Sequence, residues 1–229
     1  MDSPPPIDRS RSPVNWVLAC SLLGILAISA VFTDFTVTSY FLAPQDHLPG
    51  DLRRIIAFFE VFGHGAGVCV ILLAVAVLDR PNIRSVLRLA TCAFGAGIVN
   101  VGLKLLIGRT RPNELWLQGT PASILDSFHG FAPALQAESW RAVFDRSVQS
   151  FPSGHSATAA GLAMGLAWLY PQGRWFFLFL AAMTMLQRVV SGAHYTSDTL
   201  AGAAVGVLVA SLCCDRRWLG WWFDRIEGR

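Results

Sequence analysis

Six long apolar runs divide this chain, and they constrain its fold more than any other feature of the sequence. A helix needs about 20 predominantly apolar residues to cross the hydrocarbon core of a bilayer. Only 14% of the residues are charged, against about a quarter in soluble domains. We therefore expect an all-α membrane protein, a bundle of six transmembrane helices at 15–33, 55–78, 86–107, 154–171, 174–191 and 197–214.

The first apolar run admits a second interpretation, as a secretory signal peptide. Arg9 and Arg11 precede it, and Ala27-Ile-Ser-Ala30 resembles a small-residue cleavage site. The run is long for the apolar core of a signal peptide, so we favour a retained helix. The expected organisation is a disordered cytoplasmic tail, a six-helix membrane domain and a second cytoplasmic tail, at 1–14, 15–214 and 215–229.

The distribution of Lys and Arg sets the expected orientation, because short cytoplasmic loops carry an excess of these residues. It favours a cytoplasmic N-terminus in the cell (inner) membrane, and residues 109–151 then form a long non-cytoplasmic loop between helices 3 and 4. Long loops in compact proteins are often functional. We expect an interfacial cap with a short amphipathic helix, or alternatively a passive tether, from the aromatic residues Trp116, Phe128, Phe131, Trp140 and Phe144.

Cations gather where the third run ends. Lys104 and Arg111 are seven residues apart and share a face if the helix continues, although Pro112 opposes that continuation. The planar fork of Arg matches phosphate oxygens, and Lys adds a point charge. Both side chains could equally be ordinary residues that extend to the membrane surface. That ordinary role is the interpretation we favour for Arg109.

The fourth run begins with Pro152, Ser153, Gly154 and His155. Proline and serine are common at helix starts for structural reasons alone. A helix start also presents free N–H groups and partial positive charge, which suit an anion. Gly154 would let a phosphate oxygen approach the backbone, and His155 would lie beside it as a proton donor.

The fifth run ends with Arg188, and His194 and Asp198 follow at a spacing of four residues. If that stretch is helical, the imidazole and the carboxylate share a face within reach of a hydrogen bond. A carboxylate on one ring nitrogen fixes the tautomer and leaves the other nitrogen free to attack. Thr196 and Ser197 are expected to cap the sixth helix.

With six spans, all three stretches fall on the same, non-cytoplasmic face. Together they resemble the signature of the type 2 phosphatidic acid phosphatase (PAP2) superfamily, written K-x6-R-P, P-S-G-H and S-R-x5-H-x3-D. Their order and spacings fit, and the resemblance covers roughly residues 55–214. One position departs from the pattern, because Gln187 stands where a serine is expected before Arg188.

The resemblance implies a role for each matching residue. His194 would attack phosphorus and form a phosphohistidine, Asp198 would orient His194, and His155 would protonate the leaving oxygen and then activate water. The phosphate would be bound by Lys104, Arg111, Ser153, Gly154 and Arg188. No metal and no cofactor are implied. From residue types alone, either histidine could be the attacking group, and Asp198 is the internal hint for His194.

The sequence therefore favours a metal-independent integral-membrane phosphatase that acts on a lipid phosphate or diphosphate. Phosphatidic acid, phosphatidylglycerophosphate, undecaprenyl diphosphate and a lipid A phosphate remain candidate substrates. The expected partners are that lipid and the bilayer, and no basic stripe with interleaved aromatics indicates nucleic acid. The alternatives are a non-catalytic phospholipid-binding or transport protein and a vanadium-dependent haloperoxidase-like enzyme. His64, an ionisable residue within the second run, is a functional candidate by default, but we favour a neutral, packed histidine.

Overall fold

The computed structural model describes residues 15–42, 48–117, 123–131 and 145–229. The predicted tail 1–14 lies outside these residues. The described part is mostly helical, as predicted, with one addition: a two-stranded antiparallel sheet of β1 (Ile107–Arg109) and β2 (Phe128–Phe131). The helices are α1 (Trp16–Leu42), α2 (Gly50–Phe58), α3 (Glu60–Gly63), α4 (Gly65–Leu78), α5 (Ser85–Ala90), α6 (Ala96–Lys104), α7 (Pro112–Leu117), α9 (Gly154–Leu169), α10 (Arg174–Val190), α11 (Thr196–Cys214) and α12 (Gly220–Glu227).

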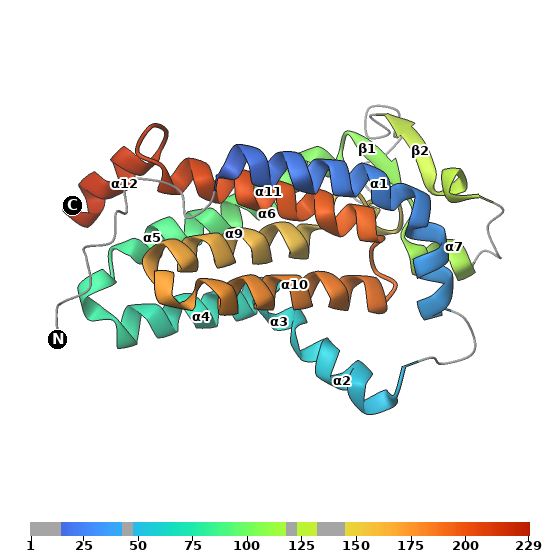
Figure 1. The fold of residues 1–229 in the computed structure, drawn as a ribbon, viewed down its shortest axis with the longest axis horizontal. Helices are drawn as coiled ribbons and strands as arrows, with labels where there is room; N and C mark the ends of the chain where they lie inside the picture. Colours follow the sequence, from blue (N-terminus) through green and yellow to red (C-terminus); the bar gives the residue numbers. More distant parts are fainter. Residues whose placement is uncertain (1–14, 43–47, 118–122, 132–144) are drawn as a thin grey trace.

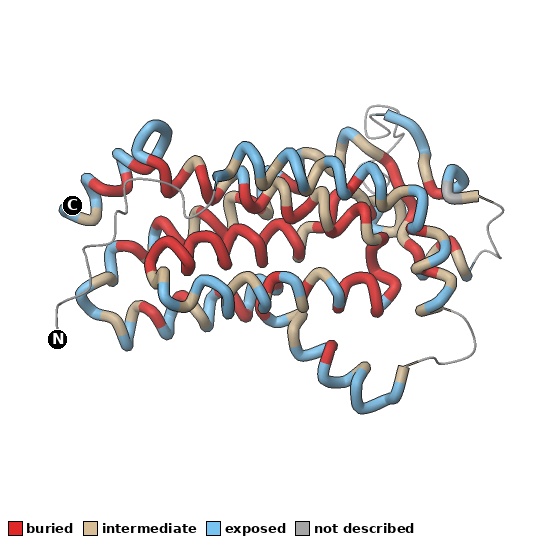
Figure 2. Tube along the Cα trace, in the orientation of Figure 1, coloured by how far each residue is buried: buried red, intermediate tan, exposed pale blue. Residues whose placement is uncertain are grey.

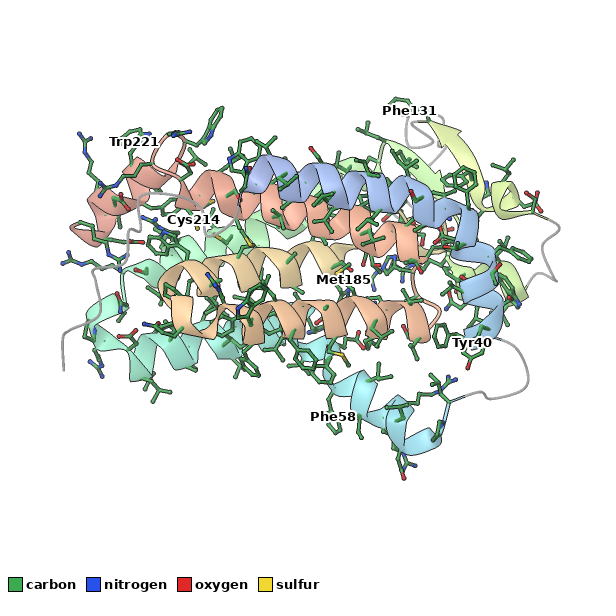
Figure 3. The ribbon with its side chains drawn as sticks, in the orientation of Figure 1. Tyr40, Phe58, Phe131, Met185, Cys214 and Trp221 are labelled. Atoms are coloured by element: carbon green, nitrogen blue, oxygen red, sulfur yellow. The ribbon has the colours of Figure 1, made fainter. Side chains whose placement is uncertain are left out.

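The long helices form an elongated bundle (Figure 1). Helices α1, α4, α6, α9, α10 and α11 run along its length, and the C-terminal helix α12 lies at one end. The small sheet, α7 and α2 lie at the opposite end. The labelled side chains mark the two ends, with Trp221 at the first and Tyr40 and Phe131 at the second (Figure 3). The second end is where the three motifs meet.

Helix α9 is the centre of the bundle and is buried along almost its whole length (Figure 2). Its sequence is rich in Gly and Ala, which allows neighbouring helix backbones to approach closely in a membrane. A Cβ atom on Gly206 of α11 would lie 2.3 Å from the Ala157 carbonyl oxygen. A Cβ atom on Gly161 of α9 would lie 2.1 Å from the Cys92 carbonyl oxygen. These glycines therefore set the distances between α9 and its neighbours.

Within the described ranges, three helices are long and apolar enough to cross a membrane: Trp16–Leu42, Ser85–Lys104 and Thr196–Cys214. A fourth candidate is the pair Gly50–Gly63 and Gly65–Leu78, which is bent by 67°. Helices α9 and α10 coincide with the fourth and fifth predicted runs but have only 16 and 17 residues. A multi-pass membrane protein is thus confirmed, and the count of six spans stays a prediction.

The bend in the second run corrects the expectation of one helix over 55–78. His64 has an extended backbone, and its Nδ1 accepts a hydrogen bond from the Ala66 N–H at 3.3 Å, so it caps α4. Gly63 lies so close to α9 that an added Cβ atom would be 2.6 Å from the His155 carbonyl oxygen. The break therefore lets the second run pack against the start of α9.

Within the predicted C-terminal tail, residues Gly220–Glu227 form α12, which is held by a buried arginine. Arg88 is fully buried, and its Nη2 and Nε atoms lie 2.5 Å from Asp224 and 2.9 Å from Glu227. The Arg88 guanidinium also lies 3.9 Å from the centre of the Trp168 ring. A buried charge is tolerated only when it is paired in this way.

We predict that Gly206→Ala destabilises the bundle, because its new methyl group would overlap the Ala157 carbonyl. Overpacking of this kind costs about 1–3 kcal/mol, which corresponds to a drop in Tm of very roughly 3–10 °C for a chain of this size. Thermal unfolding of detergent-solubilised protein measures the shift. Gly24→Ala in α1 is the matched control, since nothing lies within 4 Å of its added Cβ. Equal Tm values for the two variants would contradict this packing argument.

Candidate active site

Three cations from separate elements converge at the sheet end of the bundle. Lys104 is the last residue of α6, Arg111 follows β1, and Arg188 lies in the last turn of α10. The charges of Arg111 and Arg188 both act on Lys104, so the three groups share one neighbourhood. Burial, followed by the charges of Arg188 and Arg146, lowers the pKa of Arg111. Cations gathered so closely favour an anion among them.

Lys104 and Arg111 do not share a helix face, contrary to one sequence expectation. The helix ends at Lys104, and strand β1 separates the two residues. Each cation is fixed by the segment that precedes α9. Lys104 Nζ donates to the Gln149 carbonyl at 2.8 Å, and Arg111 Nε donates to the Arg146 carbonyl at 2.8 Å. The loop 109–151 therefore helps to build the site, although its predicted aromatics Trp140 and Phe144 lie outside the described residues.

Arg188 is paired with a carboxylate that the sequence analysis did not single out. Its Nη1 donates to Glu60 Oε1 at 2.7 Å, and Gln187 Nε2 donates to Glu60 Oε2 at 3.1 Å. Gln187, which stands where the family pattern has a serine, thus orients Glu60. The same Oε1 atom lies 3.6 Å from His155 Nε2. Glu60 belongs to the bent second run. Its negative charge would compete with a bound anion for Arg188.

The Pro152–His155 stretch starts α9, as predicted. Ser153 is the N-cap, and its Oγ accepts hydrogen bonds from the backbone N–H and the hydroxyl of Ser156. Gly154 and His155 form the first turn, where N–H groups lack partners inside a helix. Asn100, one turn before Lys104 on α6, donates from Nδ2 to the Pro152 carbonyl at 3.0 Å. Its buried amide therefore holds this loop against α6.

His194 and Asp198 are neighbours, but not as a pair on one helix. His194 precedes α11, which begins at Thr196, whereas Asp198 lies in the first turn of α11. His194 Nδ1 is 3.7 Å from Asp198 Oδ2, longer than a direct hydrogen bond. Ser150 Oγ donates to Asp198 Oδ2 at 2.6 Å and lies 3.5 Å from His194 Nδ1. Asp198 Oδ2 also accepts from the Tyr195 N–H, so its position is fixed.

Arg109 is not the surface-reaching residue expected from the sequence. It is fully buried, and its Nη1 donates to Asp198 Oδ1 at 2.5 Å and to Ser197 Oγ at 2.7 Å. Its Nη2 donates to Asp34 Oδ2 at 2.9 Å. Burial alone would lower the pKa of Arg109, but the charges of Asp198 and Asp34 raise it. Ser197 serves this cluster, in place of the capping role predicted for it.

A groove of about 580 Å³ adjoins the site on the side of the bent second run. Its walls are mostly apolar, with Glu60 and His64 as the ionisable residues among them. The rings of His64 and His155 have centres 5.8 Å apart. His64 is exposed, so the expected packed histidine was wrong. The groove therefore connects an apolar surface to the polar end of α9.

The two histidines and the three cations share one neighbourhood, because their charges act on one another. His155 Nε2 and Arg188 Nε make no hydrogen bond within the described ranges. The charges of Arg188, His194 and Lys104 all act on His155. Among the residues that the structure describes, no group of three or more His, Cys, Asp or Glu could hold a metal ion.

Sequence reasoning missed several polar residues that contact the site: Asp34, Glu60, Asn100, Arg109 and Ser150. The sequence contains a signal that could have identified two of these residues. Glu60 and Asn100 lie within predicted spans, where a polar residue is a functional candidate by default. Asp34 follows the first predicted span by one residue and was overlooked for that reason. The partners of Arg109 are distant in sequence, so no local pattern could reveal them.

Comparison with known proteins confirms the predicted resemblance. A family model described as the PAP2 superfamily matches residues 85–222. A Rhizobium etli lipid A 1-phosphatase is 36% identical over 117 residues, which are 51% of this chain and 43% of that protein. A Mycobacterium tuberculosis decaprenylphosphoryl-5-phosphoribose phosphatase is 30% identical over 72% of this chain and 79% of its own length. The chain therefore aligns with less than half of the lipid A phosphatase.

The fold is also similar to a solved structure. A transmembrane PAP2-type phosphatidylglycerolphosphate phosphatase from Bacillus subtilis superposes with a TM-score of 0.52. The superposition covers 87% of this chain and 92% of the other, at 17% sequence identity. At that identity the likeness shows a common fold.

We predict that Glu60→Gln strengthens the binding of inorganic phosphate, because it removes a negative charge that competes for Arg188. An interaction of about 1 kcal/mol between partly exposed charges corresponds to roughly fivefold in affinity. Calorimetric titration of the solubilised protein with phosphate measures the change. Asp51→Asn, a highly exposed carboxylate of α2, is the control. Unchanged or weaker binding by the Glu60 variant would contradict the competition.

Proposed function

The chain belongs to the PAP2 superfamily, and from this premise we propose that it is an integral-membrane phosphatase that hydrolyses a lipid phosphate or diphosphate without a metal. One observation carries the proposal: two histidines, with three cations around them, lie together at one end of a membrane bundle. A protein that only bound phospholipids would not need a nucleophile beside an orienting carboxylate.

In the proposed reaction, Lys104, Arg111 and Arg188 bind the phosphate oxygens, helped by the N–H groups at the start of α9. His194 Nδ1 faces Asp198, so Nε2 attacks phosphorus. The bond from phosphorus to the lipid oxygen breaks as His155 donates a proton to that oxygen. The negative charge of the bound phosphate favours the protonated form of His155 that this step requires.

The second half of the reaction releases the phosphate. His155, now neutral, takes a proton from water, and the resulting hydroxide attacks the phosphohistidine. The bond between phosphorus and Nε2 breaks, which restores His194 and yields inorganic phosphate. Fixed cations supply much of the catalysis in phosphoryl transfer, because charge spreads over the equatorial oxygens. Ser153, which caps α9, contributes by holding the first turn of the helix in place through its bonds from Ser156.

The groove beside Glu60 and His64 suits the hydrocarbon part of a lipid. Its apolar walls belong to the bent second run, which faces outward from the bundle. We propose that the substrate enters sideways from the outer leaflet, with six spans and the site on the non-cytoplasmic side of the inner membrane. The names of the relatives make a lipid A 1-phosphate the first substrate to test, ahead of phosphatidic acid and phosphatidylglycerophosphate.

We expect solubilised protein to release inorganic phosphate from at least one member of a panel of lipid phosphates and diphosphates, assayed with EDTA. The His194→Ala variant should bind the same lipid but release no phosphate above background, because the nucleophile is gone. His129→Ala, a histidine on β2 outside the proposed machinery, is the control. Turnover by the His194 variant would refute its role, and lipid binding without turnover by the unaltered protein would refute the phosphatase.

The pH dependence should report on His194. Burial lowers the pKa of His194 to about 4, with Lys104 and Arg111 lowering it further and Asp198 opposing them. A nucleophile must be unprotonated, so kcat/KM should fall only as the pH drops through about 4, well below the ordinary value of about 6.5. Arg111→Gln removes one of the cations that lower the pKa of His194, so the acid limb should move to higher pH. An acid limb already near 6.5 in the unaltered protein would contradict the assignment.

A further inference from the structure

Asp34 is a buried carboxylate on a helix that otherwise faces outward. Only 6% of the apolar window of α1 is buried, yet Asp34 has no exposed surface. Its Oδ1 accepts from the Ser197 N–H at 3.0 Å, and its Oδ2 accepts from Arg109 Nη2 at 2.9 Å. A carboxylate buried at the edge of a membrane helix is costly and requires a partner. That partner, Arg109, connects Asp34 to the proposed nucleophile.

Four of the five N–H donors of Arg109 are used within this cluster, and its side chain is fully buried. Its Nε donates to Ser127 Oγ, and its two terminal nitrogens serve Asp198, Ser197 and Asp34. Its guanidinium lies 3.9 Å from the centre of the Tyr195 ring and 4.5 Å from that of Phe128. Arg109 therefore differs from the three phosphate-facing cations. It acts on the chemistry only through Asp198.

The charges in this cluster add up to one negative charge. Arg109 contributes one positive charge, and Asp34 and Asp198 contribute one negative charge each, all from side chains without exposed surface. If Arg109 were paired with Asp198 alone, the pair would be neutral and would attract a positive imidazole only weakly. Because Asp34 shares Arg109, a net negative charge remains beside His194. That charge is balanced when His194 becomes positive on attacking phosphorus.

We propose that Asp34 is a positioning residue for catalysis, which acts through Arg109 to keep Asp198 oriented and effectively negative toward His194. This inference rests on the proposed phosphatase function. Asp34 touches neither substrate nor reacting atoms. Asp34 affects only the step in which His194 gains positive charge. Replacing Asp34 should therefore change the turnover rate and leave the binding of the lipid phosphate unchanged.

The test is the Asp34→Asn variant, which keeps the shape of the side chain and the acceptor for the Ser197 N–H but removes the charge. Outer groups that orient a reacting side chain typically matter by about 10–100-fold, by analogy with those around metal ligands. We expect kcat to fall by about that factor, with KM within about twofold. Rapid-quench measurement should show the same loss in the rate of phosphohistidine formation.

Two further variants separate this role from simple anchoring of α1. Thr38→Val removes a buried polar group one turn along the same helix, and it should leave kcat unchanged. Asp34→Glu keeps the charge and should recover most of the kcat lost in Asp34→Asn. If Asp34→Asn does not fold, Asp34→Glu carries the test alone. A folded glutamate variant with kcat reduced tenfold or more would then overturn the proposal.

The outcomes also separate this inference from the proposed function. Normal kcat in a folded Asp34→Asn variant, or a raised KM with normal kcat, would overturn the positioning role while the phosphatase stands. Absence of phosphate release by the unaltered protein, measured in parallel on the same lipids, would overturn both.

Discussion

One arginine held between two carboxylates organises the end of the bundle where the site lies. Arg109 joins Asp34 on the first helix to Asp198 on the last long helix, and it does so from the hairpin that follows α6. Breaking a buried ion pair costs about 3–5 kcal/mol, because the remaining charge is left without a partner. Elements far apart in the sequence are therefore held in one arrangement. The positions of Asp198 and the neighbouring His194 depend on that arrangement.

The opposite end of the bundle uses the same device. Arg88 is fully buried, pairs with Asp224 and Glu227, and stacks against Trp168, much as Arg109 stacks against an aromatic ring. The cations of this chain thus fall into two kinds. Arg88 and Arg109 are buried, pair with carboxylates and hold helices together. Lys104, Arg111 and Arg188 are each held by a hydrogen bond and lie in one neighbourhood, where the repulsion among them favours an anion.

The extent to which the sequence predicted the structure follows from the range of each interaction. Apolar runs are local, so the helices at 154–171, 174–191 and 197–214 were located to within a few residues. The three motifs indicated the two histidines, the three cations and Asp198 that the structure brings together, because each motif lies within a short stretch. The break at His64 and the end of the third helix at Lys104 depend on packing against α9 and on the hairpin. The bonds of Arg109 to Asp34 and of Arg188 to Glu60 join residues more than 70 positions apart, and no periodicity records them.

The contact between α1 and α11 bears on how the protein is made. Asp34 emerges early in synthesis, and Ser197 and Asp198 emerge late, yet the three side chains meet around Arg109. Asp34 can pair with Arg109 once β1 has been made, but its bond from the Ser197 N–H forms only when the last long helix is inserted. A chain interrupted before α11 would lack Asp198, and its Arg109 would pair with Asp34 alone. Assembly and competence for chemistry would thus be reached in the same late step of biogenesis.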